Sequence, residues 1–244
     1  MILIVLASGR GSRLKKITLK KPKCLIKIFN NTTLLDFISG YFSLFKQVIV
    51  VTGYKSKLIE SRLNNYKVKF VYNKNYLKTN MVESLMLTKK NIKNQDVIMI
   101  YSDIFFDKKI LESLFKFKNN VIPLNSKWLK LWKKRFNTLS KIKKDAEDVK
   151  VSKKNIVSIG GKIGKKLPKY QYMGIIKIDQ NSFLKLRKFY NSLNDKNISM
   201  TKFINDSIKS KVTNFKYIKS KDYWFEVDNY EDLKFLRKEI QKLF

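Results

Sequence analysis

The first segment of the chain that suggests chemistry is a glycine- and arginine-containing stretch directly after an apolar run. Residues 2–7 are apolar, and Ser-Gly-Arg-Gly-Ser-Arg follows at residues 8–13. Gly9 and Gly11 would let the backbone adopt positive φ angles and approach a ligand closely. A tight turn of this kind directs several backbone N–H groups at one point, which suits a phosphate, and Arg13 adds a guanidinium fork for phosphoryl oxygens. The alternative on spacing alone is an ordinary glycine-rich turn.

The residue types that are missing limit the chemistry further. The stretch lacks the Gly-Lys-Ser/Thr ending of a P-loop and the third glycine of a dinucleotide-binding fingerprint. Lys-Pro-Lys follows at residues 21–23, and by itself it is typical of a solvated loop. The chain contains no histidine, which excludes a histidine-based triad and a histidine-ligated metal. Catalysis would therefore depend on carboxylates, lysine, arginine, hydroxyls or a metal held by oxygen ligands.

Length and composition indicate a single domain in a reducing compartment. The 244 residues are 44% hydrophobic, which is enough for one sizeable core. No apolar run approaches the roughly 20 residues that span a bilayer, and residues 2–7 are too short for the core of a signal peptide. The single cysteine, Cys24, excludes an internal disulfide. We expect a cytoplasmic protein without a transmembrane segment.

The formal net charge of +34 indicates either a polyanionic partner or a compositional bias. The lysines are dispersed, no long basic tail is present, and Lys, Asn and Ile are abundant together, as an AT-rich genome would produce. We favour the bias and expect no specific nucleic-acid partner. Weak, salt-sensitive binding to anions, including nucleotides, is expected in either case.

The first half of the chain alternates short apolar runs with helical patterns. The predicted strands are residues 2–6, 47–51, 68–71, 97–101 and 121–124, and the predicted helices are residues 34–45, 55–63, 81–89 and 108–117. This alternation predicts a Rossmann-like α/β fold with a mainly parallel sheet and helices on both faces. Ligands in such sheets bind beyond the carboxyl ends of the strands, where this chain has residues 7–13, Gly53 and Asp103.

The second half of the chain has a different pattern. Residues 125–148 are aromatic, basic and weakly periodic. The predicted elements that follow are a hairpin of residues 149–151 and 156–159, strands at 172–178 and 215–218, and helices at 182–192, 200–207 and 230–244. We see no linker, and predict that this half makes the sheet mixed and adds an inserted lobe.

Several segments together resemble the sugar-phosphate nucleotidyltransferase superfamily. Residues 6–14 (LASGRGSRL) and the later Pro-Lys are similar to its L-A-[AG]-G-x-G-x-R-[LM] signature followed by P-K. Residues 72–85, 101–107, 128–151, 172–178 and 224–233 resemble segments of its phosphocholine cytidylyltransferase-like branch. The resemblance covers essentially the whole chain and is greatest to cytidylyltransferases of small phosphorylated metabolites, including phosphoglutamine.

The resemblance implies a Mg²⁺-dependent cytidylyltransferase. A phosphate oxygen of the acceptor would attack the α-phosphorus of CTP and release pyrophosphate. The acceptor would be a phosphocholine-, phosphoglutamine- or phosphonate-like metabolite, activated for decoration of cell-surface polysaccharide or lipid. The alternatives are a sugar-1-phosphate nucleotidyltransferase that uses UTP, GTP or dTTP, and a non-catalytic basic protein that binds RNA or membrane. Homodimers occur among such enzymes, so we also allow for a homodimer.

On this interpretation the chain is one domain, residues 1–244. Residues 1–124 would form the nucleotide-binding half, residues 125–228 the acceptor-binding half, and residues 229–244 a carboxyl-terminal helix. The residues that the resemblance implies for nucleotide binding are Leu6, Ala7, Ser8, Gly9, Arg10, Gly11, Ser12, Arg13, Lys23, Gly53, Asn80, Ser84 and Ser102.

Four of the implied site residues would be catalytic. Arg13 would bind the β- and γ-phosphates, and Lys23 would bridge the α-phosphate and the incoming phosphate. Asp103 and Asp228 would hold Mg²⁺, which prefers hard oxygen ligands. The alternative for both aspartates is capping of a following helix, and the same alternative applies to Asn80.

The acceptor-binding residues would lie mainly in the second half. They are Trp128, Trp132, Arg135, Asp145, Glu147, Tyr172, Trp224 and Glu226. The aromatic members and Glu226 would form a box for a quaternary ammonium group, with Trp128 and Trp132 on one face if that stretch is helical. Arg135 would contact the acceptor phosphate, and the other two acids an amine or hydroxyls. The alternative is that the aromatic residues form ordinary core.

Overall fold

The computed structural model of the chain describes residues 1–14, 16–92 and 94–242. Strands of the first half are β1 (Ile2–Ala7), β4 (Gln47–Thr52), β5 (Val68–Tyr72) and β6 (Val97–Tyr101). Strands of the second half are β8 (Val121–Asn125), β9 (Val149–Ser152), β10 (Asn155–Ile159), β11 (Gln171–Tyr172), β12 (Ile175–Ile178) and β13 (Lys216–Ser220). These boundaries lie within a few residues of those predicted.

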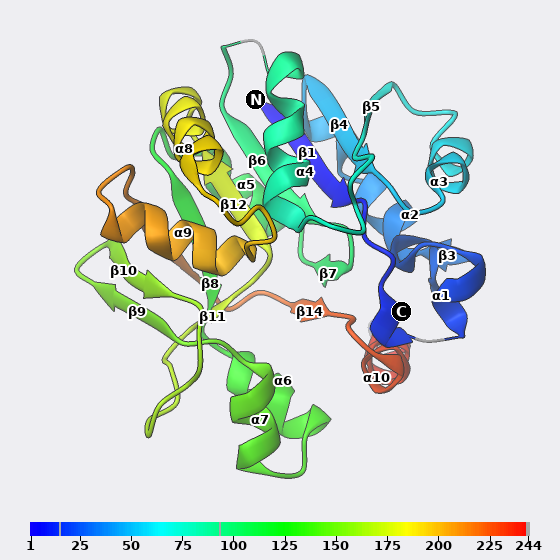
Figure 1. The fold of residues 1–244 in the computed structure, drawn as a ribbon. Helices are drawn as coiled ribbons and strands as arrows, with labels where there is room; N and C mark the ends of the chain where they lie inside the picture. The colour runs from blue at the N-terminus through cyan, green and yellow to red at the C-terminus, as the bar shows by residue number, and fades with distance from the viewer. Residues whose placement is uncertain (15, 93, 243–244) are drawn as a thin grey trace.

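These ten strands form one sheet, in the order β5-β4-β1-β6-β12-β8-β13-β10-β9, with β11 paired to β8. The pairs β1–β4, β1–β6, β4–β5 and β8–β13 are parallel, whereas β12 runs antiparallel to β6 and β8. Figure 1 shows the blue strands β1 and β4 beside the green strand β6, which the yellow strand β12 of the second half follows in the sheet. The fold is therefore α/β with a mainly parallel, mixed sheet, as predicted.

The register of β1 explains why the sequence motifs come together. All six residues of β1 are buried, which means that both faces of the sheet are covered at this strand. Ala7 is paired with Thr52, and Leu6 with Tyr101. Because these strands are parallel, their carboxyl ends meet at one edge of the sheet. The loops that follow β1, β4 and β6 therefore start side by side.

The helices are α1 (Ile17–Lys20), α2 (Leu34–Ser39), α3 (Ser56–Arg62), α4 (Met81–Leu87), α5 (Lys109–Phe115), α6 (Trp128–Arg135), α7 (Leu139–Asp145), α8 (Gln180–Ser192), α9 (Met200–Lys209) and α10 (Tyr230–Ile240). In Figure 1, α4, α8 and α9 lie together in front of the sheet, and α9 contacts both of the others. None of the described helices is long and apolar enough to cross a membrane.

Three predicted elements differ from the structure. The helix predicted over residues 34–45 ends at Ser39, and a separate 3₁₀ turn occupies residues 42–44. The strand predicted over residues 172–178 is interrupted at Gly174, which has a φ of +73°. The carboxyl-terminal helix ends at Ile240 rather than at 244, and residues 243–244 lie outside the described residues.

Two small sheets were not predicted, and both lie beside the edge that carries the motifs. Strands β2 (Lys27–Phe29) and β3 (Thr32–Thr33) form one, and β7 (Ile104–Phe106) and β14 (Trp224–Glu226) form the other. Helix α10 packs against them in a second hydrophobic core of Leu14, Ile26, Ile28, Leu34, Phe105, Phe225, Val227, Leu233, Leu236 and Ile240. This second core joins the amino-terminal loop to the carboxyl-terminal helix.

A buried ion pair ties the centre of the sheet to the start of α8. The side chain of Lys177, on β12, is 0% exposed, and its Nζ lies 2.7 Å from Asp96 Oδ2. Asp96 Oδ1 also accepts a hydrogen bond from the backbone N–H of Gln180. The carboxylate side chain is 33% exposed. Water can therefore reach Asp96 but not the ammonium group.

This asymmetry predicts unequal effects of removing the two partners. Asp96→Ala should lower the free energy of unfolding by about 3 kcal/mol, because it leaves an unpaired buried charge. Lys177→Met keeps the side-chain volume and leaves the carboxylate to water, so it should cost about 1 kcal/mol or less. Urea unfolding of both variants measures the difference. Equal losses would show that the removal of Asp96 does not leave the Lys177 ammonium as a buried unpaired charge.

Candidate active site

The loop after β1 is shaped by one glycine rather than two. Gly11 has a φ of +70°, and a Cβ at this position would lie 2.7 Å from the Cβ of Lys23. The Gly11 carbonyl accepts a hydrogen bond from the Thr18 hydroxyl at 3.0 Å. Gly9 does not have a positive φ, so the prediction that both glycines adopt left-handed backbone was wrong for it. A Cβ on Gly9 would meet no described atom within 4 Å, which leaves space for a ligand.

Lys23 lies between the two predicted metal-binding aspartates. Its Nζ is 2.7 Å from Asp103 Oδ2 and 2.9 Å from Asp228 Oδ1. Arg13 Nη1 lies 2.8 Å from Asp228 Oδ2. The side chain of Lys23 is only 10% exposed and each carboxylate side chain 22% exposed. Two cations from the amino-terminal loop thus meet carboxylates from two distant parts of the chain.

The pairing of β7 with β14 creates this convergence. Glu226 is paired with Ile104, and the backbone N–H of Val227 donates to the Asp103 carbonyl at 3.0 Å. This register sets Asp228 next to Asp103, although 125 positions separate them in the sequence. Capping does not explain either aspartate, because the N-cap residue of α10 is Asn229 and Asp103 is followed by a strand.

Glu226 joins the two aspartates in a group of carboxylates that could hold a metal ion. One oxygen from each of Asp103, Glu226 and Asp228 lies within 4.8 Å of the others. Asp103 Oδ1 is buried and has no hydrogen-bond partner among the described residues. Oxygen donors in this arrangement fit Mg²⁺, which takes carboxylate ligands together with phosphate oxygens. The sequence placed Glu226 only with the acceptor, and the structure places it in this group as well.

The charges in the group change the pKa values of its members. Burial would lower the pKa of Lys23, but the carboxylates of Asp103, Asp228 and Glu226 outweigh it and raise that pKa above its ordinary value. Burial would raise the pKa of Asp228, but Lys23 and Arg13 hold it below its ordinary value. Burial and the two neighbouring aspartates raise the pKa of Glu226 well above its usual range. Lys23 therefore stays protonated and Asp228 ionised.

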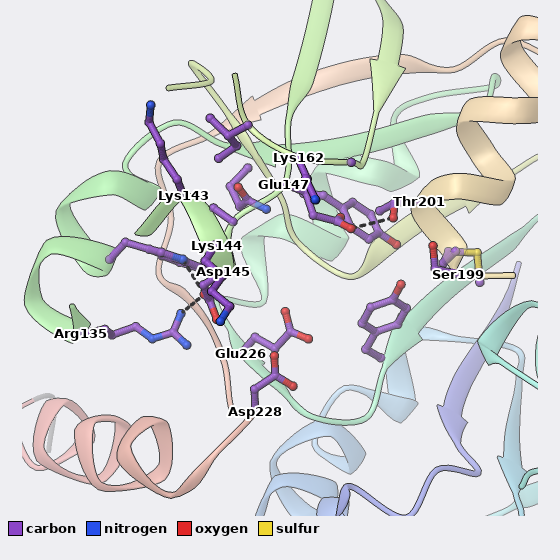
Figure 2. Close-up of a pocket in the computed structure, with 18 of the residues that line it drawn as sticks. Arg135, Lys143, Lys144, Asp145, Glu147, Lys162, Ser199, Thr201, Glu226 and Asp228 are labelled. Carbon is purple, nitrogen blue, oxygen red and sulfur yellow. Dashed lines mark hydrogen bonds and ion pairs between the residues drawn. The ribbon is translucent and has the colours of Figure 1, made fainter. Parts of the chain in front are cut away.

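Two adjoining cavities meet at these carboxylates. The smaller, of about 280 Å³, lies against the loop after β1, and the larger, of about 830 Å³, extends toward the second half of the chain. Arg13, Met81, Tyr101, Glu226 and Asp228 line both. Figure 2 shows Glu226 and Asp228 at one end of the larger cavity, with Glu147 and Thr201 at another.

Most residues predicted to bind the nucleotide line the smaller cavity. Those that do are Leu6, Ser8, Gly9, Gly11, Ser12, Arg13, Lys23 and Ser102. Asn80 lines the larger cavity and also caps α4, because its Oδ1 accepts from the Met81 N–H. Sequence reasoning missed Met81 and Tyr101. Tyr101 ends the buried strand β6, which was a signal for its position.

Of the described residues that were predicted for nucleotide binding, Ala7, Arg10, Gly53 and Ser84 line neither of these cavities. Ser84 is fully buried, and its Oγ lies 2.7 Å from Ser8 Oγ. A Cβ on Gly53 would lie 2.7 Å from the Ser8 carbonyl oxygen. Ser84 and Gly53 therefore support the loop from behind. The guanidinium of Arg10 lies over the Tyr54 ring, 5.6 Å from its centroid.

The predicted acceptor residues line the larger cavity, with one exception. Trp132, Arg135, Asp145, Glu147, Tyr172, Trp224 and Glu226 are in its wall. Trp128 shares a helical face with Trp132, as expected, but it is only 1% exposed and its Nε1 donates to the Pro168 carbonyl. Trp128 is therefore a core residue, buried in the main hydrophobic core. Thr201 and Lys162, which also line the cavity, had no signal in the sequence.

The aromatic residues of the larger cavity are held by protein contacts. Trp132 stacks on Trp224, with centroids 5.5 Å apart and an interplanar angle of 16°. The guanidinium of Arg135 lies 4.6 Å from the Trp132 centroid, and Trp132 Nε1 donates to Asp145 Oδ2 at 2.8 Å. In the box predicted for a quaternary ammonium group, the Trp224 indole and the Arg135 guanidinium thus already contact the Trp132 ring.

Arg135 supports the site instead of lying free for a substrate phosphate. Its side chain is 4% exposed, and its Nε and Nη2 donate to Asp232 Oδ1 at 2.9 and 2.6 Å. Asp232 Oδ2 accepts from the backbone N–H groups of Asp228 and Asn229. Arg135 therefore links α6, in the second half of the chain, to the backbone that presents Asp228.

This fold and site define an enzyme of the nucleotidyltransferase type. The chain belongs to the nucleotidyl transferase family, whose model matches residues 2–242. Its sequence is 32% identical to CTP:phosphoglutamine cytidylyltransferase of Campylobacter jejuni, over 94% of this chain and 96% of that protein. The resemblance that the sequence motifs indicated is thus confirmed.

Comparison with solved structures supports the same fold. The inositol-1-phosphate CTP transferase of T. maritima has a TM-score of 0.77 at 21% identity, covering 99% of this chain and 96% of that chain. The CTP:phosphocholine cytidylyltransferase of Streptococcus pneumoniae has a TM-score of 0.74 at 18% identity, covering 98% of this chain and 99% of that chain.

The two loop glycines should respond differently to alanine. Gly11→Ala should lower the free energy of unfolding by about 1–2 kcal/mol, because alanine is strained at positive φ and its methyl group would contact Lys23. Gly9→Ala should change it by about 0.5 kcal/mol or less, since the added methyl group points into open space. Chemical denaturation of both variants tests this, and similar losses in the two would contradict it.

Proposed function

We propose that this protein is a Mg²⁺-dependent cytidylyltransferase that joins CMP from CTP to a small phosphorylated metabolite and releases pyrophosphate. Support for CTP comes from the 32% identical relative, whose name specifies CTP. The choice of a small acceptor is supported by the larger cavity of about 830 Å³, which Glu226 and Asp228 line and which shares these two residues with the smaller cavity beside Lys23. A metabolite activated in this way is suited to transfer onto cell-surface polysaccharide or lipid.

One observation carries the proposal: the Lys23 ammonium, in the wall of the smaller cavity, lies within 2.9 Å of both Asp103 and Asp228, and Asp228 lines both cavities. In cytidylyl transfer an oxygen of the acceptor phosphate forms a bond to the α-phosphorus of CTP. The bond from that phosphorus to the bridging oxygen of the β-phosphate breaks, and pyrophosphate leaves. A cation at the meeting point of two anionic reactants reduces their repulsion and aligns them.

The amino-terminal loop would hold the triphosphate. Its backbone around Gly9 and Gly11 offers N–H groups at the carboxyl end of a buried strand, and Arg13 offers a guanidinium with a 72% exposed side chain. Arg13 can therefore exchange its contact with Asp228 for phosphate oxygens. The acceptor phosphate is already ionised at neutral pH, so the reaction requires no general base.

The carboxylates of Asp103, Asp228 and Glu226 would hold the metal ion. When bound there, Mg²⁺ supplies positive charge that stabilises the phosphates during transfer. The buried Asp103 oxygen without a described partner supports this assignment. The Lys23 ammonium would then move from the two aspartates to the phosphates of CTP and the acceptor.

Pyrophosphate release from each nucleoside triphosphate tests the proposed function. The wild-type protein should release pyrophosphate from CTP in the presence of Mg²⁺ and a small phosphorylated acceptor, and excess EDTA should abolish the release. UTP, GTP and dTTP with sugar-1-phosphates should support little or none. Turnover of a sugar-1-phosphate with one of these triphosphates would favour the alternative nucleotidyltransferase, and no turnover at all would reject both.

Lys23→Ala should abolish most of the activity without unfolding the protein. Loss of one positioned charge in an active site commonly costs about 10²–10³-fold in kcat, and we expect a loss of at least this size. Lys20→Ala, which removes an exposed lysine of the same segment, is the matched control. Circular dichroism checks the fold, and a Lys23→Ala variant with the wild-type rate would remove the observation on which the function rests.

A further inference from the structure

The end of the larger cavity away from Lys23 contains a carboxylate that the transfer reaction does not use. Glu147 lines this end and accepts a hydrogen bond from the Thr201 hydroxyl at 2.9 Å. Glu147 lies just before β9, and Thr201 is in the first turn of α9. Figure 2 shows the two side chains facing each other within the wall of the cavity.

Glu147 has no cationic partner among the residues that the structure describes, although the chain carries a net charge of +34. Each ion pair found among the described residues involves other acids. Burial raises the pKa of Glu147, and the Thr201 hydrogen bond opposes this effect only in part. A carboxylate has about four lone-pair sites, so the single hydroxyl leaves most of its acceptor capacity unused. A ligand with N–H donors and positive charge would satisfy it.

A lysine lies on the chain segment next to Glu147. The backbone N–H of Asp148 donates to the Gly161 carbonyl, and the Gly160 N–H donates to the Asp148 carbonyl. Gly160 has a φ of +87°, and a Cβ there would lie 2.9 Å from the Thr201 side chain. This close approach brings Lys162 into the wall of the same cavity. Lys162 makes no ion pair with a described residue, so its charge is available to an anionic group.

Trp132, in the cavity wall, has no open ring face for a quaternary ammonium ligand. Cation–π binding needs an open ring face, whereas Trp132 is stacked on Trp224 and contacts the Arg135 guanidinium. A primary ammonium group can instead donate hydrogen bonds to Glu147 and to the Thr201 hydroxyl oxygen. Charge-assisted hydrogen bonds of this kind are about twice as strong as neutral ones.

We propose that this end of the cavity binds the amino-acid end of the acceptor. Glu147 and Thr201 hold its primary ammonium group, and Lys162 holds its carboxylate. The phosphate of the same molecule then lies toward Lys23, at the other end. This inference rests on the proposed cytidylyl transfer and goes further, because it assigns the residues that select one class of phosphorylated acceptor over another.

A set of matched acceptors tests the assignment in the full-length protein with CTP and Mg²⁺. Phosphoglutamine carries an ammonium and a carboxylate, phosphoethanolamine only the ammonium, phosphocholine a quaternary ammonium, and ethyl phosphate neither charge. Pyrophosphate release gives kcat/KM for each. The wild-type values should fall in that order, from phosphoglutamine to phosphocholine and ethyl phosphate.

Glu147→Gln keeps the size of the side chain and its acceptor for Thr201 but removes the charge. It should lower kcat/KM for phosphoglutamine and phosphoethanolamine by about 10- to 100-fold, the range expected for a charge-assisted hydrogen bond, and leave ethyl phosphate unchanged. Lys162→Met should lower only the value for phosphoglutamine. Asp148→Asn, which removes a charge next to Glu147 but outside the cavity lining, should leave all four acceptors unchanged.

The outcomes separate this inference from the proposed function. If the wild-type protein turns over these acceptors and Glu147→Gln leaves their ratio unchanged, or slows all four equally, the ammonium site is wrong and cytidylyl transfer stands. A wild-type preference for phosphocholine over phosphoethanolamine also overturns the ammonium site. If no acceptor yields pyrophosphate from CTP, both the function and the site fail. Melting temperatures of the variants exclude loss of fold as the cause.

Discussion

The rest of the structure depends on holding three carboxylates close together around one lysine. Asp103, Glu226 and Asp228 have oxygens within 4.8 Å of one another. Two like charges about 4 Å apart repel by roughly 4 kcal/mol at an effective dielectric constant near 20, so the group would disperse without compensation. Lys23 supplies that compensation at 2.7 and 2.9 Å, and the second core of α10, β2, β7 and β14 holds the backbone in place. A cluster of this kind could hold a metal ion.

The two halves of the chain are joined at the same point. Arg135, from α6, binds Asp232, and Asp232 accepts hydrogen bonds from the backbone that presents Asp228. Both side chains are almost fully buried, and removal of one partner from such a pair typically costs about 3–5 kcal/mol. The wall of the larger cavity and the carboxylates around Lys23 therefore share one structural element. A change in the lobe of α6 and α7 would therefore alter the position of Asp228.

The acceptor site that we propose lies in the larger cavity. The names of the three relatives reported above specify CTP with phosphoglutamine, inositol 1-phosphate or phosphocholine. In this chain the wall combines a carboxylate without a cationic partner and an available lysine with indoles that are already in contact with protein groups. The high positive charge of the chain favours the approach of anionic substrates in general, so our proposal assigns the selectivity among them to Glu147, Thr201 and Lys162.

The amino-acid sequence by itself determined the strands, the parallel half of the sheet, the turn after β1 and the family, because apolar runs and local spacing are properties of neighbouring residues. The resemblance also identified Lys23, Asp103 and Asp228 before their proximity was known. Only the tertiary structure decided that Glu226 joins the carboxylates, that Trp128 is core and that Arg135 is paired with Asp232. The place of Glu226 and the pairing of Arg135 depend on the pairing of β7 with β14 or on the docking of α10, which join segments about 100 or more positions apart. The burial of Trp128 involves Pro168, 40 positions away. No local pattern encodes such contacts, since they are selected by the packing of the whole chain.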